Sequence, residues 1–191
     1  AGVPAAAQPK STIGVALPED DNPFYIGMLR GIRARAGELG LEVATVSSQS
    51  DKAKQINGVQ DLVARGVKGI LISPIDATAV NAAYDAAAAA KIPIVSVGRG
   101  ATSPNQTVFV AMDEKQVGRD IANWTVQAIG AKGKIALLSG PPGASTFRNV
   151  LEGYNEVIAK ASGISVAFNQ GGALSRARGL KQAEAALVAN P

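Results

Sequence analysis

The sequence predicts an α/β fold, and two observations carry that prediction. Short apolar runs begin near residues 12, 41, 69 and 93, so successive runs lie about one βαβ unit apart. Each run is almost continuously apolar, which is typical of parallel strands covered by helices on both faces. The chain is therefore expected to form doubly wound, Rossmann-like parallel sheets.

The first strand and helix are the clearest elements of this pattern. A strand over 12–17 is followed by a polar loop over 18–24 and by a helix that closes at Gly40. Asn22 is placed to cap this helix, and Pro23 to occupy its first turn, where a missing N–H costs nothing. One apolar stripe follows at helical spacing, formed by Tyr25, Leu29, Ile32, Ala36 and Leu39.

The same strand and helix unit repeats up to residue 97. Asp51 and Asp76 are placed to cap the next two helices. Strands are expected over 41–46, 69–73 and 92–97, and helices over 51–66 and 78–90.

A boundary is expected after the glycine- and proline-containing segment 98–105. A further strand over 107–111 ends there, which divides the chain into lobes at 12–111 and 112–191. A flexible lead is expected over residues 1–11. In the second lobe, helices are expected over 118–129, 145–161 and 175–190, and strands over 135–138 and 164–168. No strand follows the last helix, which predicts that the second lobe is incomplete in this chain.

Composition excludes several classes of protein. Cysteine and histidine are absent, which excludes disulfides, thiolate catalysis and cysteine-based metal sites and removes the commonest general base. The 19 Lys and Arg residues give a net charge of +4 but are scattered, so nucleic acid is not expected as a partner. The longest alanine-rich run, over 86–90, lies between Asp85 and Lys91. No run is long enough to span a bilayer, so direct membrane insertion is not expected.

Two short motifs invite a chemical interpretation, but each has a structural alternative. The Gly-Pro-Pro-Gly loop at 140–143 resembles a phosphate loop, yet no Gly-Lys-Ser/Thr follows, which favours a turn. Glu19, Asp20 and Asp21 could bind a cation, although adjacent acids before a helix more often cap it and complement its dipole. The sequence also lacks a dinucleotide fingerprint and a Gly-x-Ser-x-Gly elbow. It therefore predicts no enzyme, no catalytic residue, no metal ligand and no cofactor.

Polar and aromatic residues gather where the expected strands end. The carboxyl ends of parallel strands meet at one edge of a sheet, so such residues can converge on a ligand. Phe24 lies off the apolar stripe of its helix and is less easily explained by core packing. Tyr25 lies on the stripe, with only its hydroxyl free to reach a ligand. The candidates are Asn22, Phe24, Tyr25, Gln49, Asp51, Ser73, Asp76 and Arg99.

Segments along almost the whole chain resemble the ribose-binding-protein type of periplasmic sugar-binding protein. They include Asp21-Asn-Pro-Phe-Tyr25, Ser48-Gln49, Val59-Gln-Asp-Leu62, Leu71-Ile-Ser-Pro74, and Ile92-Pro-Ile-Val95 with Arg99. The resemblance implies two lobes joined by a hinge, which close on a small neutral sugar or polyol. It also implies a periplasmic protein that delivers its ligand to an ABC transporter permease.

The resemblance also implies roles for individual residues. Asn22 and Arg99 would hydrogen-bond ligand hydroxyls. Phe24 would stack on a sugar ring, and Tyr25 matches a second aromatic position. Asp113 would lie at the hinge. The predicted ligand-binding set is completed by Ser73, Asp76, Asp113 and Arg148.

Departures from the family pattern change the expected ligand. Gly98 stands where an Asp would fork to two hydroxyls, and Leu174 stands where an aromatic would complete the stack. The binding arginine of the second lobe falls on Val150, two residues after Arg148. Fewer polar anchors predict a smaller or less hydroxylated ligand, such as a short polyol. Because family members continue past Pro191, we expect a missing C-terminal complement, which a second chain could supply.

The alternative prediction is the ligand-sensing domain of a transcription regulator similar to the lactose repressor family, which shares this fold. Such a regulator needs a helix-turn-helix headpiece before its first strand. The ten alanine- and proline-containing residues there cannot supply one. This alternative therefore requires that a headpiece was removed.

Overall fold

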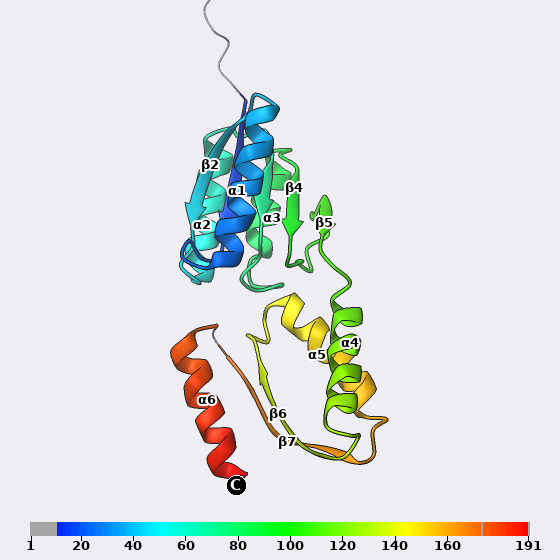
Figure 1. The fold of residues 1–191 in the computed structure, drawn as a ribbon. Coiled ribbons are helices and arrows are strands. Elements are labelled where there is room, and N and C mark those ends of the chain that lie inside the picture. The colour runs from blue at the N-terminus through cyan, green and yellow to red at the C-terminus, as the bar shows by residue number, and fades with distance from the viewer. Residues whose placement is uncertain (1–10, 173, 191) are drawn as a thin grey trace, which may run out of the picture. The chain divides into compact units, whose positions relative to one another are not determined.

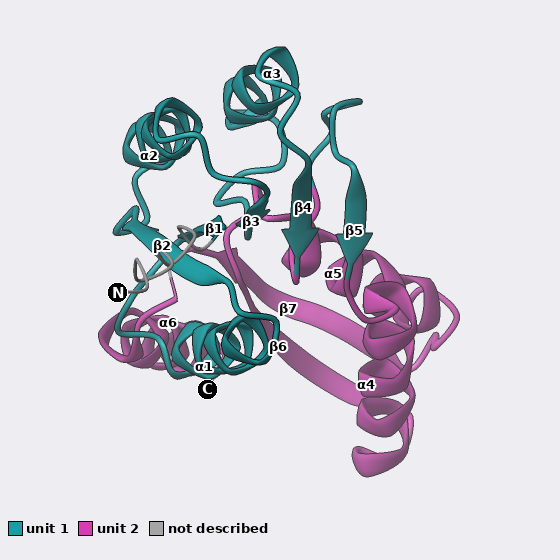
Figure 2. Ribbon diagram, turned by 90° about the horizontal axis from the view of Figure 1, so that it is seen from above, with its two compact units in different colours: residues 1–97, 101–110 teal, residues 98–100, 111–191 magenta. Residues whose placement is uncertain are grey.

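The computed structural model describes residues 11–172 and 174–190, which form two compact units, coloured separately in Figure 2. Unit 1 holds the residues up to Val97 together with Ala101–Val110, and unit 2 holds Gly98–Gly100 and the residues from Ala111 onward. Residues 1–10 of the predicted flexible lead lie outside the described residues. The lobe boundaries expected at 12–111 and 112–191 remain a prediction.

Unit 1 is built on a five-stranded parallel sheet with the strand order β2-β1-β3-β4-β5. This confirms the predicted α/β class and its parallel pairing. The elements are labelled in Figure 1. They are β1 (Thr12–Leu17), α1 (Pro23–Glu38), β2 (Glu42–Ser47), α2 (Lys52–Ala64), β3 (Ile70–Ile72), α3 (Asn81–Ala89), β4 (Ile94–Val97) and β5 (Val108–Val110).

Helices cover both faces of this sheet, as the apolar strands predicted. Alternate residues of β1 point to opposite faces. Val15 packs with α1, whereas Ala16 packs with the buried side chains of α2 and α3. Figure 2 shows α1 on one face of the sheet and α2 with α3 on the other. Leu62 and Tyr84, both fully buried, are the largest side chains of the core on the α2 and α3 face.

The helix starts of unit 1 show which sequence signals are reliable. Asn22 caps α1 and Asp51 caps α2, each accepting a hydrogen bond from a backbone N–H of the first turn, which confirms both predictions. The helix expected from residue 78 begins only at Asn81. The carboxylate of Asp76 accepts the backbone N–H groups of Thr78 and Ala79, so it caps a turn that precedes the helix.

Unit 2 contains a parallel pair of strands in its described part, with a shift of register after Ile135. Its helices pack so closely that glycine is required at the contact. A Cβ atom on Gly118 would lie 2.0 Å from the carbonyl oxygen of Val150, and one on Gly153 would lie 2.0 Å from that of Lys115. The elements are α4 (Glu114–Ala128), β6 (Gly133–Ser139), α5 (Ser145–Ile158), β7 (Ile164–Gly171) and α6 (Arg176–Ala189).

The start predicted for α4 was wrong. The sequence placed it at Gly118, but the helix begins at Glu114 because Asp113 caps it, accepting the backbone N–H of Gln116 at 2.9 Å. Gly118 lies inside the helix, where it permits the contact with α5. The strand β7 also continues three residues beyond its predicted end, to Gly171.

Several large apolar side chains of unit 2 are exposed, as are those of the edge strand β5 in unit 1. They are Val108, Phe109, Val110, Ile121, Trp124, Leu138, Val166, Leu180, Leu187 and Val188. These side chains are spread over short amphipathic elements. No helix in the described part of the chain is both long and apolar enough to cross a membrane.

Candidate functional site

The loops at the carboxyl ends of β1 and β3 bring five of the predicted site residues into one region of unit 1. The two strands pair in parallel, with Ala16 opposite Ile72, so their ends lie side by side. The loop after β1 and the start of α1 carry the first three of these residues, and the loop after β3 carries the other two. They are Asn22, Phe24, Tyr25, Ser73 and Asp76.

Asn22 uses its side chain to build the loop. Its Oδ1 accepts the backbone N–H of Phe24 at 3.0 Å, and its Nδ2 donates to the carboxylate of Glu19 at 2.8 Å. The sequence assigned Asn22 both to the helix cap and to a ligand hydroxyl. Its contacts are those of a helix cap, and this cap fixes the direction in which α1 begins.

Phe24 presents an aromatic ring to the surface. Its side chain is 56% exposed, whereas the neighbouring Tyr25 is 3% exposed. The two rings meet edge to face, with their centroids 5.2 Å apart and their planes at 79°. The hydroxyl of Ser73 lies 3.5 Å from that of Tyr25, which holds the buried tyrosine. Phe24 thus packs on a buried tyrosine while more than half of it remains accessible, and an accessible ring can pack against a flat apolar surface.

Asp76 bonds within its own loop and to the start of α2. It forms an ion pair with Lys52 at 2.8 Å and accepts two backbone N–H groups. Partial burial would raise its pKa, but the hydrogen bonds from Ala79, Lys52 and Thr78 outweigh burial and lower it from 3.8 to about 2. The carboxylate therefore stays ionised and stabilises the loop that follows β3.

The sequence reasoning missed Gln55, a fully buried residue of α2 that holds the same loop. Its Nε2 donates to the carbonyl of Ser73 at 2.9 Å, and its Oε1 accepts the N–H of Ile75 at 2.9 Å. Gln55 lies four residues before Val59 on the buried face of the helix. The sequence does contain a signal for this role, because Gln55 is a polar residue at a helix position where the periodicity calls for an apolar one.

Arg99 lies in unit 2, in a segment fixed to the start of α5. It is 8% exposed, and its guanidinium lies 5.4 Å from the centre of the Phe147 ring. The N–H of Gly100 donates to the hydroxyl of Ser145 at 2.8 Å, and the hydroxyl of Thr146 lies 2.7 Å from the carbonyl of Gly98. The arginine is therefore held on an aromatic ring that the sequence reasoning did not connect with it.

A buried carboxylate completes this part of unit 2. Glu114 of α4 is 4% exposed, and its oxygens lie 2.6 Å from the hydroxyl of Thr146 and 2.7 Å from the amide nitrogen of Asn149. These contacts link α4 to α5 beside the Arg99 segment. The result is a polar cluster in which the amide of Asn149 and the hydroxyls of Ser145 and Thr146 bond within unit 2 beside the guanidinium of Arg99.

Asp113 and Arg148 are the last two predicted site residues, and both belong to unit 2. Asp113 caps α4 with its carboxylate, so its contact is structural. Arg148 follows Phe147 on α5 and has an exposed side chain. The structure thus separates the predicted set into five residues on unit 1 and three on unit 2. Within the described residues, no group of three or more acidic side chains is arranged to hold a metal ion.

Comparison with known proteins gives the family of the chain. A model of the periplasmic binding protein domain matches residues 13–191. The ribose import binding protein of Bacillus subtilis is 32% identical over 180 residues, which cover 94% of this chain and 58% of that protein. The xylitol-binding protein of Mycolicibacterium smegmatis is 28% identical over 166 residues, covering 87% of this chain and 47% of that protein.

Solved structures agree in fold. A solute-binding protein of an ABC transporter from Mycobacterium smegmatis, with bound glycerol, matches with a TM-score of 0.90 at 28% identity. The match covers 96% of this chain and 64% of the chain of that protein. The arabinose-transporter binding protein of a Shewanella species, bound to L-arabinofuranose, matches with a TM-score of 0.88 at 27% identity, over 94% of this chain and 60% of its own.

These matches have two consequences. The chain spans less than two thirds of the length of these relatives, from 47% to 64%. Its own residues are nonetheless matched almost from end to end. The chain belongs to the periplasmic binding protein domain family, and it is similar to the sugar-binding and polyol-binding members of ABC importers.

Proposed function

We propose that this protein is a solute-binding protein that captures a small neutral sugar or polyol and delivers it to an ABC transporter. Proteins similar to it are named for ribose import and for xylitol binding, and one related structure holds glycerol. These relatives are transport proteins, which supports a binding role over an enzymatic one. No observation favours the lactose-repressor alternative.

The exposed ring of Phe24 is the observation that carries this proposal. A sugar ring has an apolar C–H face, which packs well against an aromatic ring that is free on one side. Phe24 is 56% exposed and is held from behind by the buried Tyr25. An isolated exposed phenylalanine is ordinary, but one supported in this way at the end of a strand is well suited to stacking.

The remaining predicted residues divide into proposed ligand contacts and proposed supports. Arg99 would donate to ligand hydroxyls, because a guanidinium stacked on Phe147 keeps a fixed orientation. Arg148 is proposed as a second donor from the same unit. Asn22, Ser73, Asp76 and Asp113 are proposed to act mainly by holding loops and helix starts, since their contacts already do this.

We further propose a periplasmic location and a transporter permease as partner, because the family's relatives act in import. Further segments or chains are proposed to cover, separately, the exposed apolar side chains of β5 in unit 1 and those of α4 in unit 2. Val108 and Val110 of β5 are 49% and 54% exposed, and Trp124 of α4 is 70% exposed. Packing another segment there would remove apolar surface from water, which favours its association.

Isothermal titration with ribose, xylitol and glycerol tests the proposal. Phe24→Ala should weaken binding of the ring-forming sugar by about 1–3 kcal/mol, or roughly 5- to 150-fold in Kd. It should affect glycerol less, since glycerol has no ring. Leu39→Ala is a matched control, because Leu39 lies at the other end of α1 and is also 56% exposed. Failure of the unchanged chain to bind any of the three, or equal losses in both variants, would contradict the proposal.

A further inference from the structure

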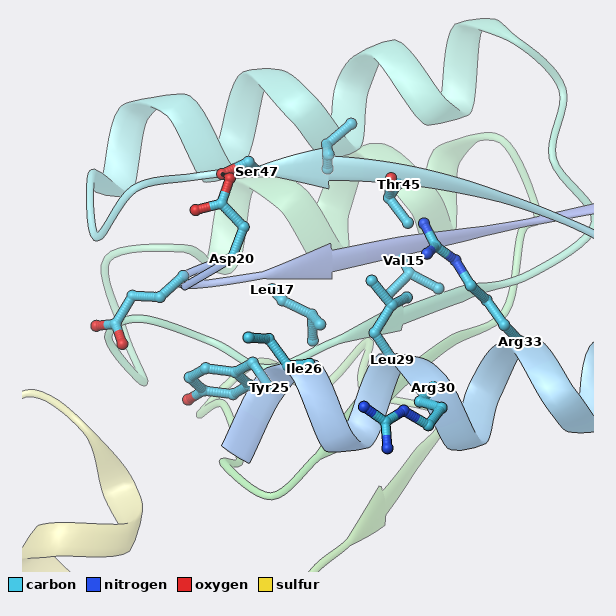
Figure 3. Close-up of a pocket in the computed structure, with 12 residues that line it drawn as sticks. Val15, Leu17, Asp20, Tyr25, Ile26, Leu29, Arg30, Arg33, Thr45 and Ser47 are labelled. Atoms are coloured by element: carbon cyan, nitrogen blue, oxygen red, sulfur yellow. Dashed lines mark hydrogen bonds between the residues drawn. The ribbon is translucent and has the colours of Figure 1, made fainter. Parts of the chain in front are cut away.

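A cavity lies wholly within unit 1, between α1 and the strands β1 and β2 (Figure 3). Its volume is about 490 Å³, within the range of pockets that hold small organic molecules. Of the residues predicted to bind sugar, it shares Tyr25 alone. Phe24, Ser73 and Asp76 do not line it, so this cavity is a separate feature of the fold.

The floor of the cavity is apolar. Val15 and Leu17 of β1 are 1% and 7% exposed, and Leu29 of α1 lies against them. Figure 3 shows these three side chains between the helix and the sheet. The apolar surface still open to water in the cavity belongs to Ile26, which is 43% exposed, and to the half-buried Leu29, and a ligand with an apolar body would cover it.

Two exposed arginines line the helix side of the cavity. Arg30 and Arg33 are three residues apart on α1, and among the described residues neither guanidinium forms an ion pair or a side-chain hydrogen bond. Arg35 of the same helix instead pairs with Glu38 at 2.6 Å. In Figure 3 the side chain of Arg33 extends from α1 toward Thr45 of β2. A guanidinium in this position can fork to a carboxylate.

Carboxylates line the opposite end of the cavity, near the end of β1. Asp20 accepts the hydroxyl of Ser47 at 3.0 Å, and Glu19 accepts the hydroxyl of Ser50 at 2.7 Å as well as the amide of Asn22. Figure 3 shows Asp20 beside Ser47, away from Arg33. These negative charges repel an anion, so they orient one toward the arginines.

We propose that this cavity binds a small organic anion, with its carboxylate on Arg33, aided by the positive charge of Arg30 on the same helix, and its apolar body over Ile26 and Leu29. A chain of about eight carbon atoms fits within a cavity of this size. The proposal is independent of the proposed sugar function, since a neutral sugar has neither an extended apolar chain nor a charge for the arginines. Either site can be disproved while the other stands.

Titration of the isotope-labelled 191-residue chain with octanoate, followed by nuclear magnetic resonance, tests the site. Octanoate should shift backbone signals of α1 and of the strands β1 and β2. The uncharged 1-octanol should bind about tenfold more weakly, because it lacks the carboxylate. Equal binding of octanoate and octanol would overturn the proposal, as would shifts confined to the exposed apolar residues of unit 2.

Variants of the arginines then identify the anion site. The double change Arg30→Gln and Arg33→Gln should weaken octanoate binding about tenfold and leave octanol binding unchanged. Arg35→Gln is the matched control, because Arg35 lies on the same helix but does not line the cavity. An equal loss in the control, or no loss in the double variant, would overturn the proposal. Unchanged signals from β3 and β4 would verify that both variants keep the fold.

Discussion

The two units differ in how completely they bury their apolar side chains. In unit 1, Leu62, Ile72 and Tyr84 are fully inaccessible, and the Tyr84 hydroxyl bonds to that of Ser96 at 2.6 Å. Among the described residues of unit 2, the most buried large apolar side chains are Tyr154 and Ile158, at 7% and 8% exposure. A five-stranded sheet with helices on both faces encloses a dry core, and the two-stranded sheet described for unit 2 leaves its core at the edge of solvent.

This difference in burial indicates which contacts stabilise each unit. Burial of side chains from several strands stabilises unit 1. Unit 2 depends more on the direct contact of α4 with α5, where Gly118 and Gly153 let the two backbones approach. Regions with less buried apolar surface open at lower free energy, so unit 2 is expected to unfold first.

Truncation of a core leucine should give the largest effect. Leu62→Ala leaves a cavity in unit 1 and should lower its free energy of unfolding by about 2–5 kcal/mol. Leu187→Ala in unit 2 is the control, since this side chain is 72% exposed, and should change stability by less than about 0.5 kcal/mol. Urea titration followed by hydrogen exchange of separate peptides measures both units. Similar losses for the two leucines would remove the contrast in burial.

A methyl group at the helix contact should have the next largest effect. Gly153→Ala forces α4 and α5 apart and should destabilise unit 2 by about 1–3 kcal/mol, with little change in unit 1. Gly179→Ala in α6 meets no atom within 4 Å and should instead stabilise that helix by about 0.5–1 kcal/mol. The same exchange experiment reports both. A harmless Gly153→Ala would show that the close approach is not needed.

Acid should weaken unit 1 through Asp76, with a smaller effect. Because the pKa of Asp76 is lowered from 3.8 to about 2 on folding, its contribution is present above about pH 4 and is lost as the pH falls toward 2. Asp76→Asn should therefore cost about 1–2 kcal/mol at pH 6 and progressively less toward pH 2. Lys52→Met, which keeps the two backbone hydrogen bonds, should cost less. A penalty for Asp76→Asn that does not change with pH would contradict this explanation.

Features set by neighbouring residues are the part of the fold that the sequence predicted best. The caps at Asn22 and Asp51 and the parallel pairing of the strands follow from short patterns, and the structure confirms them. Errors occurred where tertiary contacts decided the outcome. Gly118 resembled a helix boundary but lies within α4, because its missing Cβ serves a contact with residues more than thirty positions away.

The candidate sites were less predictable, because they depend on contacts between residues that are distant in the sequence. The position of Phe24 off the apolar stripe was readable, and its exposure agrees with that pattern. The placement of Arg99 on Phe147 was not readable, because no periodicity links a loop with a helix that begins 46 residues later. Leu39 continued the stripe in sequence, yet it is 56% exposed, since it follows the last turn of α1. The cavity beside Arg30 and Arg33 likewise depends on how α1 packs against the sheet.

The segment Gly98–Gly100 has a consequence for the order of events during protein synthesis. It lies between β4 and β5 in the chain, but it bonds to Ser145 and Thr146, up to 48 residues later. At about 5–20 residues per second, a ribosome needs roughly 2–10 s to make those 48 residues. A nascent chain can pair β1 to β4 during that interval while Arg99 remains in water. Slow codons before residue 145 would lengthen this exposure, and faster translation there would shorten it.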